Sequence, residues 1–268
     1  MTGLGGGLVV ENLAVRYGGA NAVDDVSLVA PAAEIRGLIG PNGAGKTSLF
    51  NAVSGLLRPA RGEMRLDQQR LTVMSAQRRA VAGLGRTFQR PALVPTLSVR
   101  DNVAIGFECR YRGWRDAGGL VAGRRARRAA GSATDNALDL CALGHLADRQ
   151  AASLTPGQQR FVELARACAA GYEFLLLDEP ASGLDNDETA DFSRVLGQIV
   201  RQRGTGVLLV EHDMAFVLGL CRYVYVLDAG RLIFEGTPAE LRRSEAVRQA
   251  YLGISGPRDG SKPTEVGQ

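Results

Sequence analysis

One stretch decides how this chain folds: Gly40-Pro41-Asn42-Gly43-Ala44-Gly45-Lys46-Thr47-Ser48. It matches the phosphate-loop pattern, in which a glycine and four further residues precede Gly-Lys-Thr. The apolar residues 35–39 before it predict a buried strand, and residues 47–53 after it predict a helix. Strand, loop and helix therefore follow in the order that lets this pattern hold a phosphate.

The residue types of the stretch suit an anion. Its glycines let successive backbone N–H groups face one phosphate, and the helix N-terminus adds partial positive charge. Lys46 would reach the β- and γ-phosphates, and the Thr47 hydroxyl would bind Mg²⁺. Only Lys46 and Lys262 are lysines among 32 basic residues, so a compact ammonium stands here in an arginine-rich chain. A chance glycine-rich turn is the alternative, and the flanking strand and helix disfavour it.

Composition indicates a soluble globular protein, with 268 residues, 45% hydrophobic and 22% charged. A net charge of +4 fits a solvated arginine-rich surface, and we expect no nucleic-acid partner. Four widely spaced cysteines favour free thiols in a reducing compartment. The first seven residues lack a signal peptide's features, and no apolar run approaches the roughly 20 residues that span a bilayer. We expect a cytosolic protein that can dock on a membrane protein.

The order of elements predicts an α/β fold. Residues 8–17 and 26–39 suggest antiparallel strands before the phosphate loop, with a further strand at 63–66. Residues 83–89 return to the sheet, and residues 91–152 have helical periodicity without strand-like runs. Strand and helix then alternate, which favours a mostly parallel sheet with functional groups at the strand carboxyl ends. A hairpin at 223–227 and 231–234 closes the fold.

We predict one nucleotide-binding domain at 1–253. Its core, with an antiparallel β subdomain, comprises 1–92 and 161–253, and an inserted helical subdomain comprises 93–160. Thr155, Pro156 and Gln158 predict a helix start with a proline at the first position and a capping box. The Gly/Pro/Ser/Lys-containing residues 254–268 predict a disordered tail.

Two carboxylates end the buried strand at 174–178. Asp178 is placed to bind Mg²⁺, directly or through water, and Glu179 to polarise an attacking water. A solvated turn with two acids is the alternative, which four preceding apolar residues make weaker.

The order of these motifs resembles the ATP-binding subunits of ABC transporters, and the resemblance covers residues 8–253. It implies a P-loop NTPase (RecA-like) core, bound ATP and Mg²⁺, and ATP hydrolysis. By resemblance Gln89 is the Q-loop glutamine, which senses the nucleotide and the permease and also binds the metal, and Asp185 is the D-loop residue. His212 is the switch histidine, which belongs with Glu179 and Gln89 to the catalytic set, and Tyr17 stacks on adenine. The other histidine, His145, lies in no such motif.

The signature at 155–158 departs from the family's Leu-Ser-Gly-Gly-Gln. By resemblance, Thr155, Pro156, Gly157 and Gln158 cap the ATP that a second subunit holds. Threonine keeps a hydroxyl and Gly157 keeps close backbone approach, but Pro156 has no N–H to donate. We expect a modest loss of nucleotide affinity across the dimer interface.

Three further motifs are similar to those of the branched-chain amino acid uptake group: residues 85–89, 210–214 and 250–253. The resemblance implies an importer ATPase at the cytoplasmic face of the inner membrane, as a peripheral subunit. Its partners are permease subunits, a second ABC ATPase (a homologous chain or a copy, with a heterodimer favoured) and, indirectly, a solute-binding protein. Relatives that serve urea or short amides, a soluble ABC-type ATPase in cofactor assembly and a binding module without catalysis are the alternatives.

Overall fold

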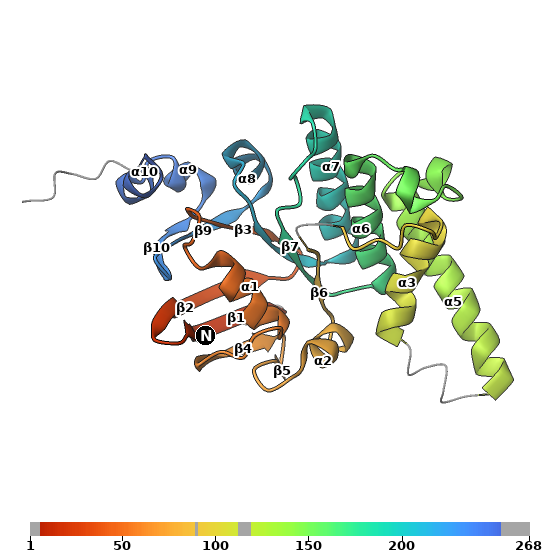
Figure 1. The fold of residues 1–268 in the computed structure, drawn as a ribbon, viewed down its shortest axis with the longest axis horizontal. Helices are drawn as coiled ribbons and strands as arrows, with labels where there is room; N and C mark the ends of the chain where they lie inside the picture. Colours follow the sequence, from red (N-terminus) through yellow and green to blue (C-terminus); the bar gives the residue numbers. More distant parts are fainter. Residues whose placement is uncertain (1–5, 89–90, 112–118, 253–268) are drawn as a thin grey trace, which may run out of the picture.

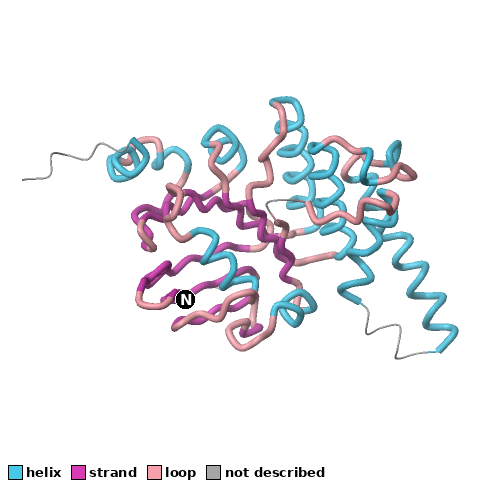
Figure 2. Tube along the Cα trace, in the orientation of Figure 1, coloured by secondary structure: helices cyan, strands magenta, loops and turns pink. Residues whose placement is uncertain are grey.

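The computed structural model describes residues 6–88, 91–111 and 119–252. Gln89 and the tail predicted at 254–268 lie outside these ranges. Figure 2 shows the strands gathered in one part of the molecule and a mainly helical part at one end. The α/β fold expected from the sequence is confirmed.

A six-stranded sheet forms the centre, in the order β10-β9-β3-β8-β7-β6. The five strands from β9 to β6 are parallel, and β10 is antiparallel to β9. The prediction of a mostly parallel sheet is therefore confirmed. The strands are β3 (Ile35–Ile39), β6 (Leu84–Arg86), β7 (Phe174–Asp178), β8 (Gly206–Val210), β9 (Tyr223–Asp228) and β10 (Arg231–Gly236).

A second, antiparallel sheet has the order β2-β1-β4-β5. The antiparallel pairing predicted for 8–17 and 26–39 is confirmed for β1 and β2, but residues 35–39 instead form β3, which is parallel to its neighbours in the six-stranded sheet. Its strands are β1 (Gly7–Tyr17), β2 (Ala20–Pro31), β4 (Arg61–Leu66) and β5 (Gln69–Arg70).

The helices alternate with these strands along the chain or follow them. They are α1 (Lys46–Ser54), α2 (Ala76–Val81), α3 (Val99–Tyr111), α5 (Gly119–Leu140), α6 (Pro156–Ala170), α7 (Asn186–Arg203), α8 (Met214–Leu220), α9 (Pro238–Leu241) and α10 (Glu245–Leu252). None of these helices is both long and apolar enough to cross a bilayer. The subdomain division remains a prediction, and its second boundary, at 160/161, falls within α6.

The core lies on both faces of the six-stranded sheet, because successive side chains of a strand point to opposite faces. In β7, Leu175 and Leu177 pack in the cluster that includes α6, α7 and α8. Phe174 and Leu176 pack in the cluster that includes α1 and the four-stranded sheet. Figure 1 shows these two layers on either side of the central strands.

This parallel arrangement brings three loops to one edge. The phosphate loop follows β3, and further loops follow β7 and β8. Asp178, the last residue of β7, pairs with Val210, the last of β8. The residues predicted to carry the chemistry therefore follow directly on neighbouring strand ends.

Candidate active site

The phosphate loop has a backbone that glycine alone tolerates at two points. Gly40 has φ 153° and Gly45 has φ 105°, both in the range that L side chains rarely adopt. A Cβ at Gly40 would collide with the carbonyl oxygen of Leu227, and one at Gly45 with that of Ala22. The loop is therefore fitted tightly between β9 and β2.

Lys46 begins α1 with its side chain turned into this loop. Its ammonium donates to the carbonyl oxygens of Gly40 at 2.6 Å and Pro41 at 2.9 Å, and the residue is 6% exposed. Burial lowers the pKa of Lys46, while the charges of Glu179 and Asp178 oppose that shift. The cation thus lies within electrostatic reach of both carboxylates that follow one another at the end of β7.

Asp178 is buried and paired with a residue to which sequence reasoning assigned no role of its own. Its Oδ2 lies 3.0 Å from Nη2 of Arg86, the last residue of β6. Arg86 also donates through Nη1 to Asn51 Oδ1 at 2.7 Å and Ser54 Oγ at 2.9 Å, both on α1. One guanidinium therefore ties the β7 carboxylate to the phosphate-loop helix. The partners are far apart in sequence, so only the motif at 85–89 could have drawn attention to Arg86.

Glu179 and His212 face each other across two loops. His212 Nε2 lies 3.0 Å from Glu179 Oε1, and the side chains are 42% and 20% exposed. Glu179 has φ 49°, a left-handed conformation that costs a non-glycine residue about 1–3 kcal/mol. Its backbone N–H donates to the carbonyl of Val210 at 2.9 Å. The strained turn thus places a carboxylate beside an imidazole at the strand edge.

The signature residues start α6, with the capping box that the sequence predicts. Thr155 Oγ1 accepts from the Gln158 backbone N–H at 3.2 Å, and Gln158 Oε1 accepts from the Thr155 N–H at 3.1 Å. Pro156 occupies the first turn, where its missing N–H leaves no gap in the helix. A Cβ at Gly157 would collide with the carboxylate of Glu188 on α7.

Asp185 caps α7 with the same reciprocal geometry. Its Oδ1 accepts from the Glu188 N–H at 2.8 Å, and Glu188 Oε2 accepts from the Asp185 N–H at 3.2 Å. The structure thus brings the signature and the D-loop together through Glu188. Figure 1 shows the start of α6 well apart from α1, so the signature and phosphate loop of one chain do not form a single site.

Tyr17 ends β1 with 51% of its surface exposed. Tyr17 pairs with Ala20 of the following strand, and that strand contacts the phosphate loop at Ala22. Gln89 lies outside the described residues.

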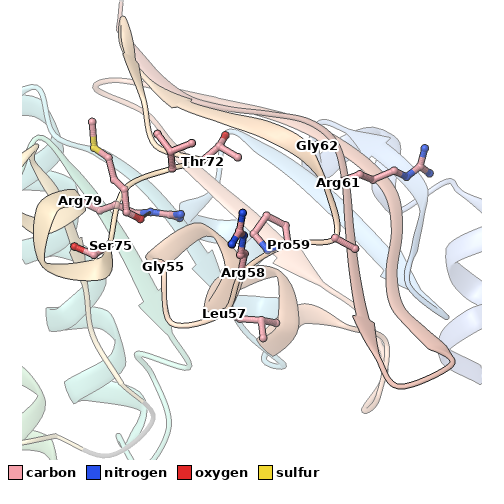
Figure 3. A pocket seen from close by; sticks show the side chains of 12 residues that line it. Gly55, Leu57, Arg58, Pro59, Arg61, Gly62, Thr72, Ser75 and Arg79 are labelled. Carbon is pink, nitrogen blue, oxygen red and sulfur yellow. Dashed lines mark hydrogen bonds between the residues drawn. The ribbon is translucent and has the colours of Figure 1, made fainter.

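A separate cavity of about 490 Å³ lies beyond the far end of α1, between β4 and α2 (Figure 3). On its wall, Arg79 is 2% exposed and donates to the carbonyls of Ala52 and Val53 at 2.6 Å each. These carbonyls belong to the last turn of α1, where a cation is favoured by the helix dipole. Arg79 therefore holds the end of the phosphate-loop helix opposite the phosphate loop.

The residues present suit Mg²⁺. The Thr47 hydroxyl and the Asp178 carboxylate are hard oxygen donors, and the hydrogen bond from Arg86 to this carboxylate goes to its Oδ2. The described part of the chain contains no cluster of three or more His, Cys, Asp or Glu side chains that could hold a metal. Mg²⁺ typically binds one or two protein oxygens together with substrate phosphates and water, so such a sparse donor set fits.

Comparisons with known proteins agree with this geometry. Residues 23–182 match the ABC transporter family, and residues 231–255 match the branched-chain amino acid ATP-binding cassette transporter family. The high-affinity branched-chain amino acid transport ATP-binding protein LivG of Salmonella typhimurium is 38% identical, over 92% of this chain and 97% of LivG. The lipopolysaccharide export system ATP-binding protein LptB of Haemophilus influenzae is 35% identical, with the same coverage of 92% and 97%.

Among solved structures, the ADP conformation of MJ1267, an ATP-binding cassette of an ABC transporter, superposes with a TM-score of 0.80. It is 26% identical and covers 92% of this chain and 99% of its own. The chain therefore belongs to the ATP-binding subunits of ABC transporters, is similar to the branched-chain amino acid group among them, and is an ATP-hydrolysing transport subunit.

Proposed function

We propose that this chain energises an importer for branched-chain amino acids, as a peripheral subunit at the cytoplasmic face of the cell membrane. The match of residues 231–255 carries the choice of substrate class, and the LivG relative supports it. In this chain the matched segment includes β10, α9 and α10, which pack at one edge of the six-stranded sheet.

In this proposal two ATPase subunits close on ATP. One subunit holds the phosphates through its phosphate loop, residues 40–48, and the second covers them with its signature, residues 155–158. Thr155 and Pro156 are exposed at the start of α6, which makes them available to a second subunit. The partner is a homologous ATPase chain or a second copy. Tyr17, exposed at the end of β1, stacks on the adenine.

Hydrolysis is assigned to the facing pair. The contact of 3.0 Å between Glu179 Oε1 and His212 Nε2, beside buried Lys46, is the observation that carries this assignment. Glu179 orients water for in-line attack, and His212 holds the γ-phosphate geometry. When bound, Mg²⁺ supplies charge neutralisation of the phosphate oxygens. Asp178, Thr47 and Gln89 would hold the ion.

A groove beside the predicted Q-loop is the proposed contact for a permease. A cavity of about 190 Å³ lies where residues 86–88 meet α3 and α6. Phe88 lines it and is 45% exposed, an apolar surface next to Gln89. Glu163 on α6 accepts the Phe88 N–H at 3.2 Å, so closure around nucleotide would be transmitted to this groove.

The LptB relatives favour a second candidate, an export ATPase, at 35% identity. The test is affinity purification of the tagged Glu179→Gln chain from detergent-solubilised membranes of its host with ATP present. We expect permease subunits and a second ATPase, and a solute-binding protein that binds branched-chain amino acids in a direct binding assay.

Recovery of other partners would change the proposed function. A binding protein selective for urea or short amides would correct the substrate, and lipid-export components would favour export. Recovery of soluble partners alone would contradict the membrane role and point to an assembly ATPase.

A further inference from the structure

Glu211 is a buried carboxylate to which the proposed mechanism gives no task. It directly follows β8 and is 4% exposed. Its Oε1 accepts a hydrogen bond from the Ala181 backbone N–H at 2.7 Å, and its Oε2 accepts one from the His212 N–H at 3.0 Å. One side chain therefore joins the loop that follows Glu179 to the loop that carries His212.

With two further contacts, these hydrogen bonds link the same two loops at three places. On its more exposed side, His212 Nε2 lies 3.0 Å from Glu179 Oε1. At the strand ends, the Glu179 N–H donates to the Val210 carbonyl at 2.9 Å. On the buried side, the Glu211 carboxylate spans the same two loops. The buried Glu211 side chain thus fixes the distance between the two proposed catalytic side chains, Glu179 and His212.

The energetics favour a positional role over a stabilising one. Burial raises the pKa of Glu211, three backbone N–H groups (Ala181, His212 and Asp213) oppose the shift, and the nearby charge of Glu179 adds to it. A buried carboxylate close to a second carboxylate is costly, so this residue is a poor source of stability. A glutamine could not replace it fully, because the amide nitrogen cannot accept an N–H.

The left-handed backbone of Glu179 makes such support necessary. At φ 49° this residue is in a sparsely populated conformation that persists only when its surroundings hold it. Ala181 lies two residues further on, and Glu211 anchors its N–H. Without that anchor the turn is free to relax and carry the Glu179 carboxylate away from His212.

We propose that Glu211 is a positioning residue that holds the loop of Glu179 against the loop of His212. This inference rests on the proposed catalytic roles of those two residues. It predicts an effect on turnover without an effect on ATP affinity, because among the described residues Glu211 makes no hydrogen bond to the phosphate loop.

The kinetic test compares Glu211→Ala and Glu211→Gln with the unchanged full-length protein. We expect kcat to fall about 10- to 100-fold for alanine, the loss that a displacement of about 1 Å produces, and less for glutamine. The dissociation constant for ATP should stay within about twofold, since that step depends on the phosphate loop.

A matched control separates position from stability. Tyr225 is 2% exposed, and its hydroxyl donates to the Val29 carbonyl at 2.7 Å, outside the proposed site. Tyr225→Phe should lower the free energy of unfolding while leaving kcat within about twofold. If Tyr225→Phe loses as much turnover as Glu211→Ala, general destabilisation explains the loss and the inference is wrong.

A second readout needs no turnover. His145 and His212 are the only histidines, so the ring resonances in an NMR spectrum are readily assigned. Glu211→Ala should shift the His212 resonance and speed hydrogen exchange at the Ala181 amide, while His145 stays in place. An unmoved His212 resonance together with unchanged kcat would overturn the inference.

One further variant separates an error in the proposed catalytic role of Glu179 from an error in the positioning role of Glu211. Glu179→Gln, measured in parallel, tests the proposed catalytic role directly. If it abolishes hydrolysis while Glu211→Ala leaves kcat unchanged, the positioning role alone is wrong. If Glu179→Gln turns over normally, the proposed catalytic role is wrong, and the inference built on it falls with it.

Discussion

Removing the Arg86 guanidinium should expose how strongly the chain depends on the link between β7 and the phosphate-loop helix. Its contact with Asp178 spans 3.0 Å, between side chains that are 8% and 10% exposed. Arg86→Ala deletes this ion pair and both hydrogen bonds to α1. It therefore leaves a buried carboxylate with only the more distant charge of Lys46 to oppose it.

The expected loss follows from that burial. Deleting one partner of a buried ion pair costs about 3–5 kcal/mol, because the remaining charge is uncompensated. Arg86 also carries a buried Nε without a hydrogen-bond partner, and its removal recovers part of a desolvation cost of about 1–3 kcal/mol. We therefore expect a loss near the lower end, about 3 kcal/mol in the free energy of unfolding.

Urea unfolding measures this loss directly. The matched control is Arg100→Ala, which removes an ion pair with Asp135 whose side chains are 46% and 58% exposed. An exposed pair of this kind is worth at most about 1 kcal/mol. With Arg86 removed, ATP with Mg²⁺ should also stabilise the folded protein more than ATP with a chelator does. This difference in stabilisation should be larger in the variant than in the unchanged protein. Equal losses for the two variants would refute the reasoning.

Two further predictions concern the signature and a buried acid. Pro156→Gly should modestly strengthen ATP affinity in the assembled dimer, because it restores an N–H at the start of α6; unchanged affinity and turnover would show that the proline costs nothing. Burial raises the pKa of Glu163, so the folded protein keeps this proton to higher pH than the unfolded chain does. Protonated Glu163 therefore contributes fully to stability below the pKa that it has in the unfolded chain. This contribution is lost as pH rises through the higher pKa that Glu163 has in the folded protein. Glu163→Gln should therefore gain stability relative to the unchanged protein as pH rises above 4.5, the ordinary pKa of a glutamate, measured by urea unfolding at each pH; a constant difference would contradict this.

Sequence reasoning was most successful where local chemistry decides structure. The glycines around Lys46 predict the curled loop, and Thr155 with Gln158 predicts the capping box that the structure contains. The buried strands were recognised from apolar runs alone. These features depend on neighbours within a few residues, so a single sequence carries them.

The features that the sequence did not reveal depend on partners that are far apart in the sequence. Nothing near Arg86 indicates that it binds a carboxylate 92 residues away, and nothing near Glu211 indicates that it accepts the Ala181 N–H. Short helices such as α2 and α8 were also missed, since six or seven residues are too few to display a periodic pattern. Tertiary packing decides these features.

The most direct test of the hydrolysis proposal compares two carboxylates that flank the same strand, β7. Glu179 follows the carboxyl end of β7, and Glu173 precedes its amino end, where it pairs with Arg110. We expect Glu179→Gln to bind ATP but hydrolyse it very slowly, and Glu173→Gln to hydrolyse it at a near-normal rate. Near-normal phosphate release by Glu179→Gln would contradict the account.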